Sequence, residues 1–152
     1  MAEAVRIQRH ATAISRRRRD DMWIASTALI AALIVLPLGP NSWHGPEVAS
    51  VLAVAATAML AGQRWAVAIV VLAELLLLPT IWTRAFLPAQ GLAIHLAALG
   101  AMIAIVPGVL AMRRAAAARV VVTGRPRTQR VCRRVQVALV ATGLVMLVLP
   151  LV

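Results

Sequence analysis

The stretch WAVAIVVLAELLLLPTIW, from Trp65 to Trp82, decides the fold class of this chain. It contains one ionisable side chain. A helix needs about 17 to 25 residues to cross the hydrocarbon core of a bilayer, and the length of this stretch lies in that range. Four other apolar stretches of similar or slightly shorter length flank it, at 22–38, 47–62, 91–112 and 135–152. The sequence therefore predicts an all-α integral membrane protein, folded as a bundle of five transmembrane helices.

The arginines predict how this bundle is oriented. All 16 basic residues are arginine, and 15 of them lie in three segments: the N-terminal tail, the turn at 62–64 and the loop at 113–134. The connection at 83–90 holds the remaining one, Arg84. Because cytoplasmic segments carry the excess of basic residues, we expect a cytoplasmic N-terminus and an exterior C-terminus in a multi-pass protein of the bacterial inner (plasma) membrane.

The composition predicts a single membrane domain. Hydrophobic residues make up 62% of the chain, which leaves no stretch for a water-soluble domain of ordinary size. We expect a basic cytoplasmic tail at 1–21 and a transmembrane domain at 22–152, with a basic cytoplasmic loop at 113–134. Within that loop, a turn at 123–126 should separate helical extensions of the fourth and fifth spans. A weak internal similarity raises the alternative that the bundle consists of two helical hairpins and one added helix.

The net charge of +11 indicates contact with anionic lipid and not with nucleic acid. The arginines flank apolar helices, and aromatic residues that could stack on bases are scarce. A guanidinium group stays charged and pairs well with phosphate, so the arginines beside the spans are candidate contacts to anionic head groups. A protein partner with an acidic surface is the alternative. These candidates are Arg16, Arg17, Arg18, Arg19, Arg113, Arg114, Arg127, Arg130 and Arg134.

Glu74 is the strongest candidate for a functional residue inside the membrane. It lies within the third apolar stretch, where an ionised carboxylate costs roughly 2.5 to 3.5 kcal/mol by insertion scales. We therefore expect Glu74 to face the bundle interior, to be protonated or to have a partner. It could take part in proton transfer, or it could be a neutral hydrogen-bond lock between helices.

His95 is the second intramembrane polar candidate. Counted from a turn near Phe86, Glu74 and His95 differ in depth by roughly one helical turn, so a direct or water-bridged hydrogen bond between them is a hypothesis. Such a pair could relay protons, as acid and histidine chains do in membrane carriers, or it could hold two helices together. The static lock is the favoured interpretation.

Small residues recur every four positions on two spans. In lipid, such stripes let helix backbones approach closely, and the resulting van der Waals contact drives association. The stripes serve either packing within the chain or contact with a partner subunit. Their members are Ala49, Ala53, Thr57 and Ala61 on the second span, and Gly100, Ala104 and Gly108 on the fourth.

No motif for catalysis or for cofactor binding is recognisable. The sequence lacks a phosphate-binding glycine loop, a nucleophile elbow and a Cys/His zinc spacing, so we expect neither a cofactor nor a metal site, and enzymatic activity is the less favoured class. The favoured hypothesis is a non-enzymatic accessory or structural subunit of a larger membrane assembly or homo-oligomer, with lipids and protein subunits of the membrane as partners. The alternative is a small proton-linked transporter or channel that uses Glu74 and His95.

Overall fold

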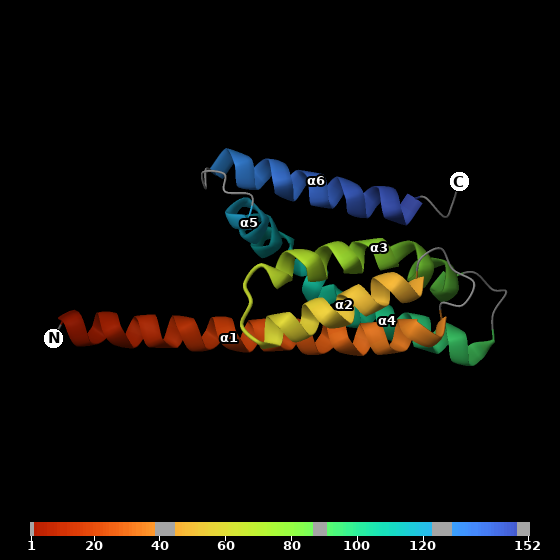
Figure 1. Cartoon of the computed structure of the whole chain (residues 1–152), viewed down its shortest axis with the longest axis horizontal. Helices are drawn as coiled ribbons and strands as arrows, with labels where there is room; N and C mark the ends of the chain where they lie inside the picture. The colour runs from red at the N-terminus through yellow and green to blue at the C-terminus, as the bar shows by residue number, and fades with distance from the viewer. Residues whose placement is uncertain (1, 39–44, 87–90, 123–128, 149–152) are drawn as a thin grey trace.

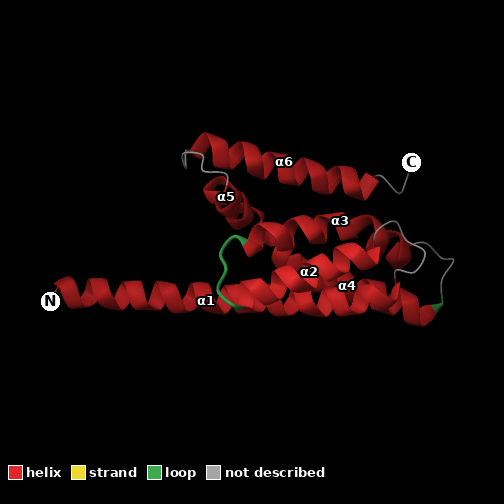
Figure 2. Ribbon diagram, viewed as in Figure 1, coloured by secondary structure: helices red, strands yellow, loops and turns green. Residues whose placement is uncertain are grey.

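The computed structural model of the chain describes residues 2–38, 45–86, 91–122 and 129–148. These residues form helices and short connections, and no strand occurs among them (Figure 2). The predicted all-helical class is confirmed. In chain order the elements are α1 (Ala2–Val35), the 3-10 turn η1 (Leu36–Leu38), α2 (Gly45–Leu60), α3 (Ala66–Phe86), α4 (Leu92–Leu110), α5 (Met112–Val122) and α6 (Gln129–Val148).

Helices α1 to α4 form a closed four-helix group. α1 packs along α2 and α4, and α3 packs along the same two helices, so each helix has two main neighbours in the group. The shorter α5 and the C-terminal α6 pack on α3 and on each other (Figure 1). α6 is thus attached to the four-helix group chiefly through α3 and α5.

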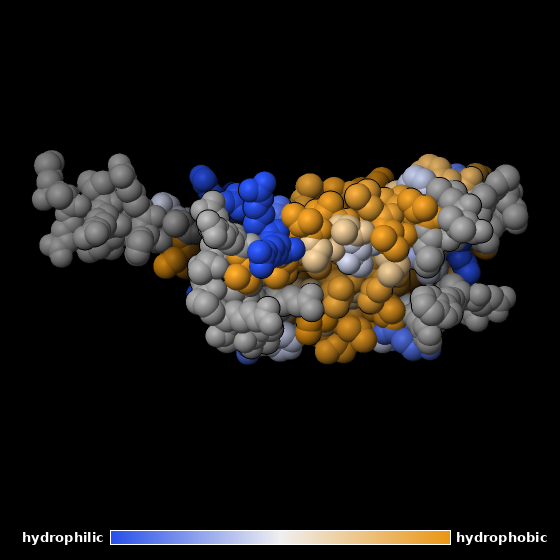
Figure 3. All heavy atoms as spheres, turned by 90° about the horizontal axis from the view of Figure 1, so that it is seen from above, coloured by the Kyte–Doolittle hydropathy of each residue, from blue (hydrophilic) through white to orange (hydrophobic). Residues whose placement is uncertain are grey.

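Four of the described helices have the length and composition of membrane spans. Four are long and apolar enough to cross a bilayer, at Ile14–Leu38, Ala66–Phe86, Leu92–Leu110 and Val131–Val148. α2 is apolar but has 16 residues, slightly fewer than the about 17 that a span needs. Figure 3 shows an apolar belt with hydrophilic residues towards its two ends. These features fit a multi-pass membrane protein, whereas the fifth span and the orientation stay predictions.

Alanine allows α1 to pack closely in the core. Ala25, Ala28, Ala31 and Ala32 are fully buried, and their spacing places them along one face of the helix. Small side chains on that face let the backbones of neighbouring helices come near, which favours association in lipid. This stripe on α1 was not among the predicted packing residues.

α3 extends one turn beyond its predicted end at Trp82 and finishes at Phe86. In this last turn the hydroxyl of Thr83 donates to two backbone oxygens of the preceding turn, at 3.0 and 3.2 Å. Ala85 is buried in a small cluster with Ala98 of α4. Because these contacts keep the last turn helical, the connection between α3 and α4 begins only after Phe86.

The chain changes direction between α4 and α5. The residues after the fourth span are helical, as predicted, but α4 ends at Leu110 and a separate helix begins at Met112. The N–H of Ala111 donates to the carbonyl oxygen of Gly108 at 2.8 Å, which tightens the last turn of α4. One turn earlier, Pro107 has no N–H to donate, so the helix is already weakened there. The helical segment predicted after the fourth span is therefore present, as the separate helix α5.

The last helix starts ahead of its apolar part. The turn predicted at 123–126 lies outside the described residues. Beyond it, α6 begins at Gln129 and includes Arg130, Arg133 and Arg134 before the apolar stretch. This agrees with the predicted helical extension of the fifth span.

Candidate functional site

Glu74 is fully buried in the middle of α3. As expected, its side chain faces the interior of the bundle. It lies directly against the backbone of Gly108 in α4, since a β-carbon added at position 108 would overlap the carboxyl group of Glu74. The glycine therefore creates the space that the carboxyl group occupies.

The carboxyl group of Glu74 has no polar partner in the described part of the chain. Neither of its two oxygens has a hydrogen-bond partner there, although both are inaccessible to solvent. A buried polar group without a hydrogen bond costs free energy, and a buried charge without a partner costs much more. The neutral, protonated form is therefore the one that fits this site.

The predicted direct hydrogen bond between Glu74 and His95 is absent from the structure. Two contacts fix the register of α3 against α4: Glu74 faces Gly108, and Ala85 clusters with Ala98. His95 is 13 residues before Gly108, which corresponds to roughly 20 Å along a helix axis. The prediction was wrong because it centred the turn near Phe86, whereas the observed pairs centre it near residue 91.

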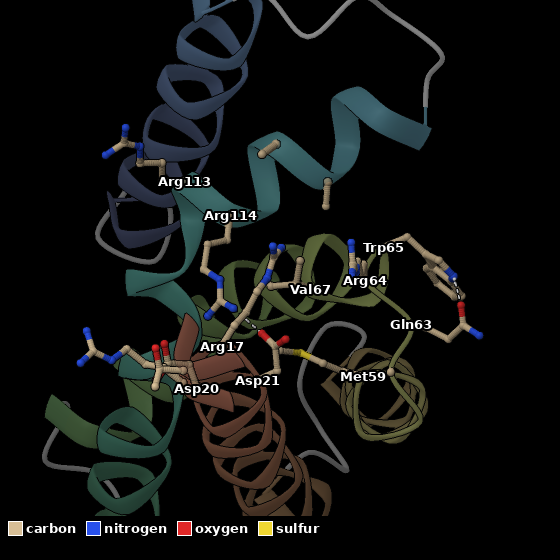
Figure 4. Close-up of a pocket in the computed structure, with 15 residues that line it drawn as sticks. Arg17, Asp20, Asp21, Met59, Gln63, Arg64, Trp65, Val67, Arg113 and Arg114 are labelled. Atoms are coloured by element: carbon tan, nitrogen blue, oxygen red, sulfur yellow. Dashed lines mark hydrogen bonds and ion pairs between the residues drawn. The ribbon is translucent and has the colours of Figure 1, made fainter. Parts of the chain in front are cut away.

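A second feature lies at the end of the bundle where α1, the connection between α2 and α3, and α5 meet. A cavity of about 1230 Å³ opens there, and five arginines contribute to its wall (Figure 4). The other lining residues include two aspartates and several apolar side chains. The lining residues are Thr12, Arg16, Arg17, Asp20, Asp21, Met59, Gly62, Gln63, Arg64, Trp65, Val67, Arg113, Arg114, Ala117 and Ala118.

One ion pair crosses this cavity between α5 and α1. The guanidinium group of Arg114 donates to the carboxylate of Asp21 at 2.5 Å, and both side chains are about one-third exposed. Arg17 and Arg64 differ from Arg114, because within the described ranges neither has a carboxylate at ion-pairing distance. Their charges are therefore available to a ligand.

Arg18, Arg19 and Arg134 do not line this cavity. Arg19 lines a second cavity of about 530 Å³ between α1 and the end of α4, together with Trp23 and Pro107. Arg18 and Arg134 are exposed. Arg127 lies outside the described residues, and Arg130 belongs to α6.

The two predicted small-residue stripes have different surroundings. On α4, Gly108 and Ala104 are buried, and Gly100 lies near the side chain of Ile34 in α1. This stripe therefore packs within the chain. On α2 the stripe passes from the core to the surface: Ala49 is buried, Ala53 is half-buried, and Thr57 and Ala61 are exposed.

The sequence did not single out Arg64 as a site residue. It was counted only as evidence for orientation, because it stands alone in a short turn far along the chain from the other arginines. A signal was nevertheless present, since the orientation rule places this turn on the same membrane face as the N-terminal tail and the loop at 113–134. Arginines on one face of a small bundle must lie within a limited area.

The chain matches no protein-family model, no curated protein and no solved structure. The described residues contain no group of three or more His, Cys, Asp or Glu side chains that could hold a metal ion. The two features that stand out are thus the unpartnered carboxyl group at Gly108 and the arginine-lined cavity at the end of the bundle.

Proposed function

We propose that the protein is a non-enzymatic accessory or structural subunit of a larger membrane assembly or homo-oligomer. One observation carries this proposal: α6 is long and apolar enough to span the membrane but is hardly covered by the rest of the chain. Of residues 131–148, only Leu139 and Gly143 are buried. A spanning helix with so few intramolecular contacts gains stability from packing against another protein.

The exposed face of α6 consists of large apolar side chains. Val137, Leu144, Val145 and Val148 each expose more than half of their surface. Lipid can cover such a face, but lipid provides no close interhelical packing. A partner helix would add the van der Waals contacts that α6 lacks, which supports a role as a subunit.

The two intramembrane polar candidates, Glu74 and His95, do not converge on one site, as the polar groups of an enzyme or a proton carrier would. Glu74 and His95 are separated by about 20 Å along α4 in the register described above. Glu74 lines neither of the two cavities at the arginine-rich end. A scaffold role requires no such convergence.

Photo-crosslinking from α6 in native membranes tests this proposal. A photoreactive amino acid at position 145 should give a discrete protein adduct, either a dimer of the chain or a conjugate with another membrane protein. The matched control is position 33, because Leu33 is an apolar residue on α1 that, like Val145, exposes more than half of its surface. The same weak, diffuse labelling at both positions, combined with a monomeric mass in native lipid, would overturn the proposal.

The proposal includes the orientation in the membrane. The arginines of α1, of the α2–α3 connection and of α5 line one cavity, so three segments predicted to be cytoplasmic lie at the same end of the bundle. This supports a cytoplasmic N-terminus, and the proposal includes five spans in a bacterial inner membrane. This orientation is tested by cysteine labelling in a chain whose Cys132 is replaced by serine. A thiol reagent added outside intact cells should modify a cysteine introduced at position 43 and should not modify a cysteine introduced at position 63.

A small proton-linked transporter or channel is the second candidate. The observation that favours it is the unpartnered carboxyl group of Glu74, which lies against Gly108 of the facing α4, next to Pro107, a helix position without a backbone N–H. Proton flux into liposomes, compared between the natural chain and Glu74→Gln, tests it. Flux that the substitution abolishes would support this candidate over the subunit role, whereas equal flux in both chains, or none, would remove it.

A further inference from the structure

The arginine-lined cavity has the properties of a binding site for a phosphate group. Arg17 comes from α1 and Arg64 from the connection between α2 and α3, so two segments far apart in the sequence bring positive charges to one space. Figure 4 shows both side chains projecting into the region between α1, this connection and α5. A guanidinium group presents several N–H donors in a planar fork, which matches the oxygens of a phosphate.

The acidic residues of the cavity do not cancel this charge. Asp21 is already paired with Arg114. Asp20 is exposed and, in Figure 4, lies on the side of Arg17 that is away from Arg64. Five arginines against two aspartates leave the cavity wall with an excess of three positive charges.

The apolar part of the wall indicates that the phosphate belongs to a lipid. Met59, Val67 and Ala118 line the same cavity as the arginines. Trp65 is 44% exposed beside them, and its indole N–H donates to the side-chain oxygen of Gln63 at 3.1 Å. Tryptophan prefers the boundary between head groups and acyl chains. Figure 3 shows hydrophilic residues directly bordering the apolar belt at the arginine-rich end.

We infer that this cavity binds the head group of an anionic phospholipid, with Arg17 and Arg64 holding the phosphate and the apolar wall receiving the start of an acyl chain. The Asp21–Arg114 ion pair links α1 to α5 at the wall of this cavity. The site goes beyond the proposed subunit role and does not depend on it, because a monomer contains the complete cavity. It also differs from general attraction of arginines to an anionic surface, since it requires two particular side chains.

Native mass spectrometry of the full chain in neutral detergent tests this site. Phosphatidylglycerol is titrated against the natural chain, against Arg17→Gln/Arg64→Gln and against the control Arg18→Gln/Arg133→Gln. The control removes the same charge from two exposed arginines that line neither cavity. The cavity variant should bind phosphatidylglycerol about tenfold more weakly per arginine lost, and the control variant should bind like the natural chain.

Two further probes identify the source of the phosphate. Phosphatidylcholine and soluble glycerol phosphate should bind at least about tenfold more weakly than phosphatidylglycerol, because the former lacks net charge and the latter lacks acyl chains. The inference would be overturned if the two double variants lost the same affinity for phosphatidylglycerol. It would also be overturned if phosphatidylcholine or glycerol phosphate bound the natural chain as tightly as phosphatidylglycerol does. If Arg17→Gln/Arg64→Gln fails to fold, Arg17→Lys/Arg64→Lys replaces it. The lysine pair keeps the charge but loses the planar fork, and should weaken binding by a smaller factor.

Discussion

The backbone of Gly108 in α4 lies against the carboxyl group of Glu74 in α3, and no β-carbon fits at position 108 while that carboxyl group keeps its place. The two residues therefore form one packing unit. The glycine provides a gap in the wall of α4, and the glutamate fills it. Any larger residue at position 108 must displace the side chain of Glu74 or the backbone of one helix.

We expect Gly108→Ala to destabilise the protein by about 1 to 3 kcal/mol, as overpacking of a filled core does. Thermal unfolding in mild detergent measures this. Gly100→Ala is the matched control, because its added β-carbon would meet only the end of the Ile34 side chain, at 3.9 Å. That control should be neutral or more stable by up to about 1 kcal/mol, since alanine favours a helix over glycine.

The double variant Glu74→Ala/Gly108→Ala tests whether the two residues are coupled. Removing the carboxyl group frees the space that the new β-carbon needs, so Gly108→Ala should cost much less in the Glu74→Ala background than alone. We expect a coupling free energy of about 0.5 to 3 kcal/mol, as for residues in direct contact. Additive effects of the two substitutions would show that Gly108 does not limit the space of Glu74.

Glu74→Met should leave the protein at least as stable as the natural chain. Methionine is unbranched and flexible enough to fill the same volume, and it buries no polar atom that lacks a hydrogen bond. Glu74→Gln keeps an unpaired polar group and should be less stable than Glu74→Met by about 1 to 3 kcal/mol. A strong loss of stability in Glu74→Met alone would instead indicate that the carboxyl group is a hydrogen-bond lock between helices.

The sequence predicted that Glu74 faces the core, but it could not predict what Glu74 contacts there. The interior position follows from the energy of a carboxyl group in lipid, which is a property of the residue alone. The partner depends on the register of α3 against α4, and hence on where the turn between them begins. The continuation of α3 to Phe86 displaced that turn and replaced His95 by Gly108 as the residue facing Glu74.

For the arginine-lined cavity too, the sequence predicted the chemical character of the region but not the arrangement of its residues. Composition and periodicity predicted apolar helices and a basic end of the bundle. Arg17 and Arg64 line the same cavity because of the way the helices are arranged, and the single sequence does not show which helices are neighbours. The alanine face of α1 was missed for a different reason, since alanine is too frequent throughout the chain to mark one stripe.

The ion pair between Asp21 and Arg114 should contribute little to stability. Both side chains are about one-third exposed, and pairs of this kind are typically worth about 0.2 to 1 kcal/mol. Asp21→Asn should therefore lower the free energy of unfolding by at most about 1 kcal/mol at low salt, and by less at high salt, where charges are screened. Asp20→Asn is the control, because Asp20 is exposed and has no ion pair with a described residue. A large effect at both salt concentrations would mean that the pair is better protected from solvent than its exposure indicates.

The attachment of α6 depends on Gly143, which lies against the side chain of Leu75 in α3. A β-carbon at position 143 would come within 3.1 Å of Leu75 and 4.0 Å of Met112, so a large side chain does not fit there. We expect Gly143→Ile to separate α6 from α3 and to leave the four-helix group of α1 to α4 intact.

Hydrogen exchange measured by mass spectrometry should then increase in α6 and stay unchanged in the four-helix group. Ala141→Ile adds the same side chain at an exposed position of α6 and should have no such effect. Equal exchange in the two variants would show that Gly143 does not determine the contact between α6 and α3.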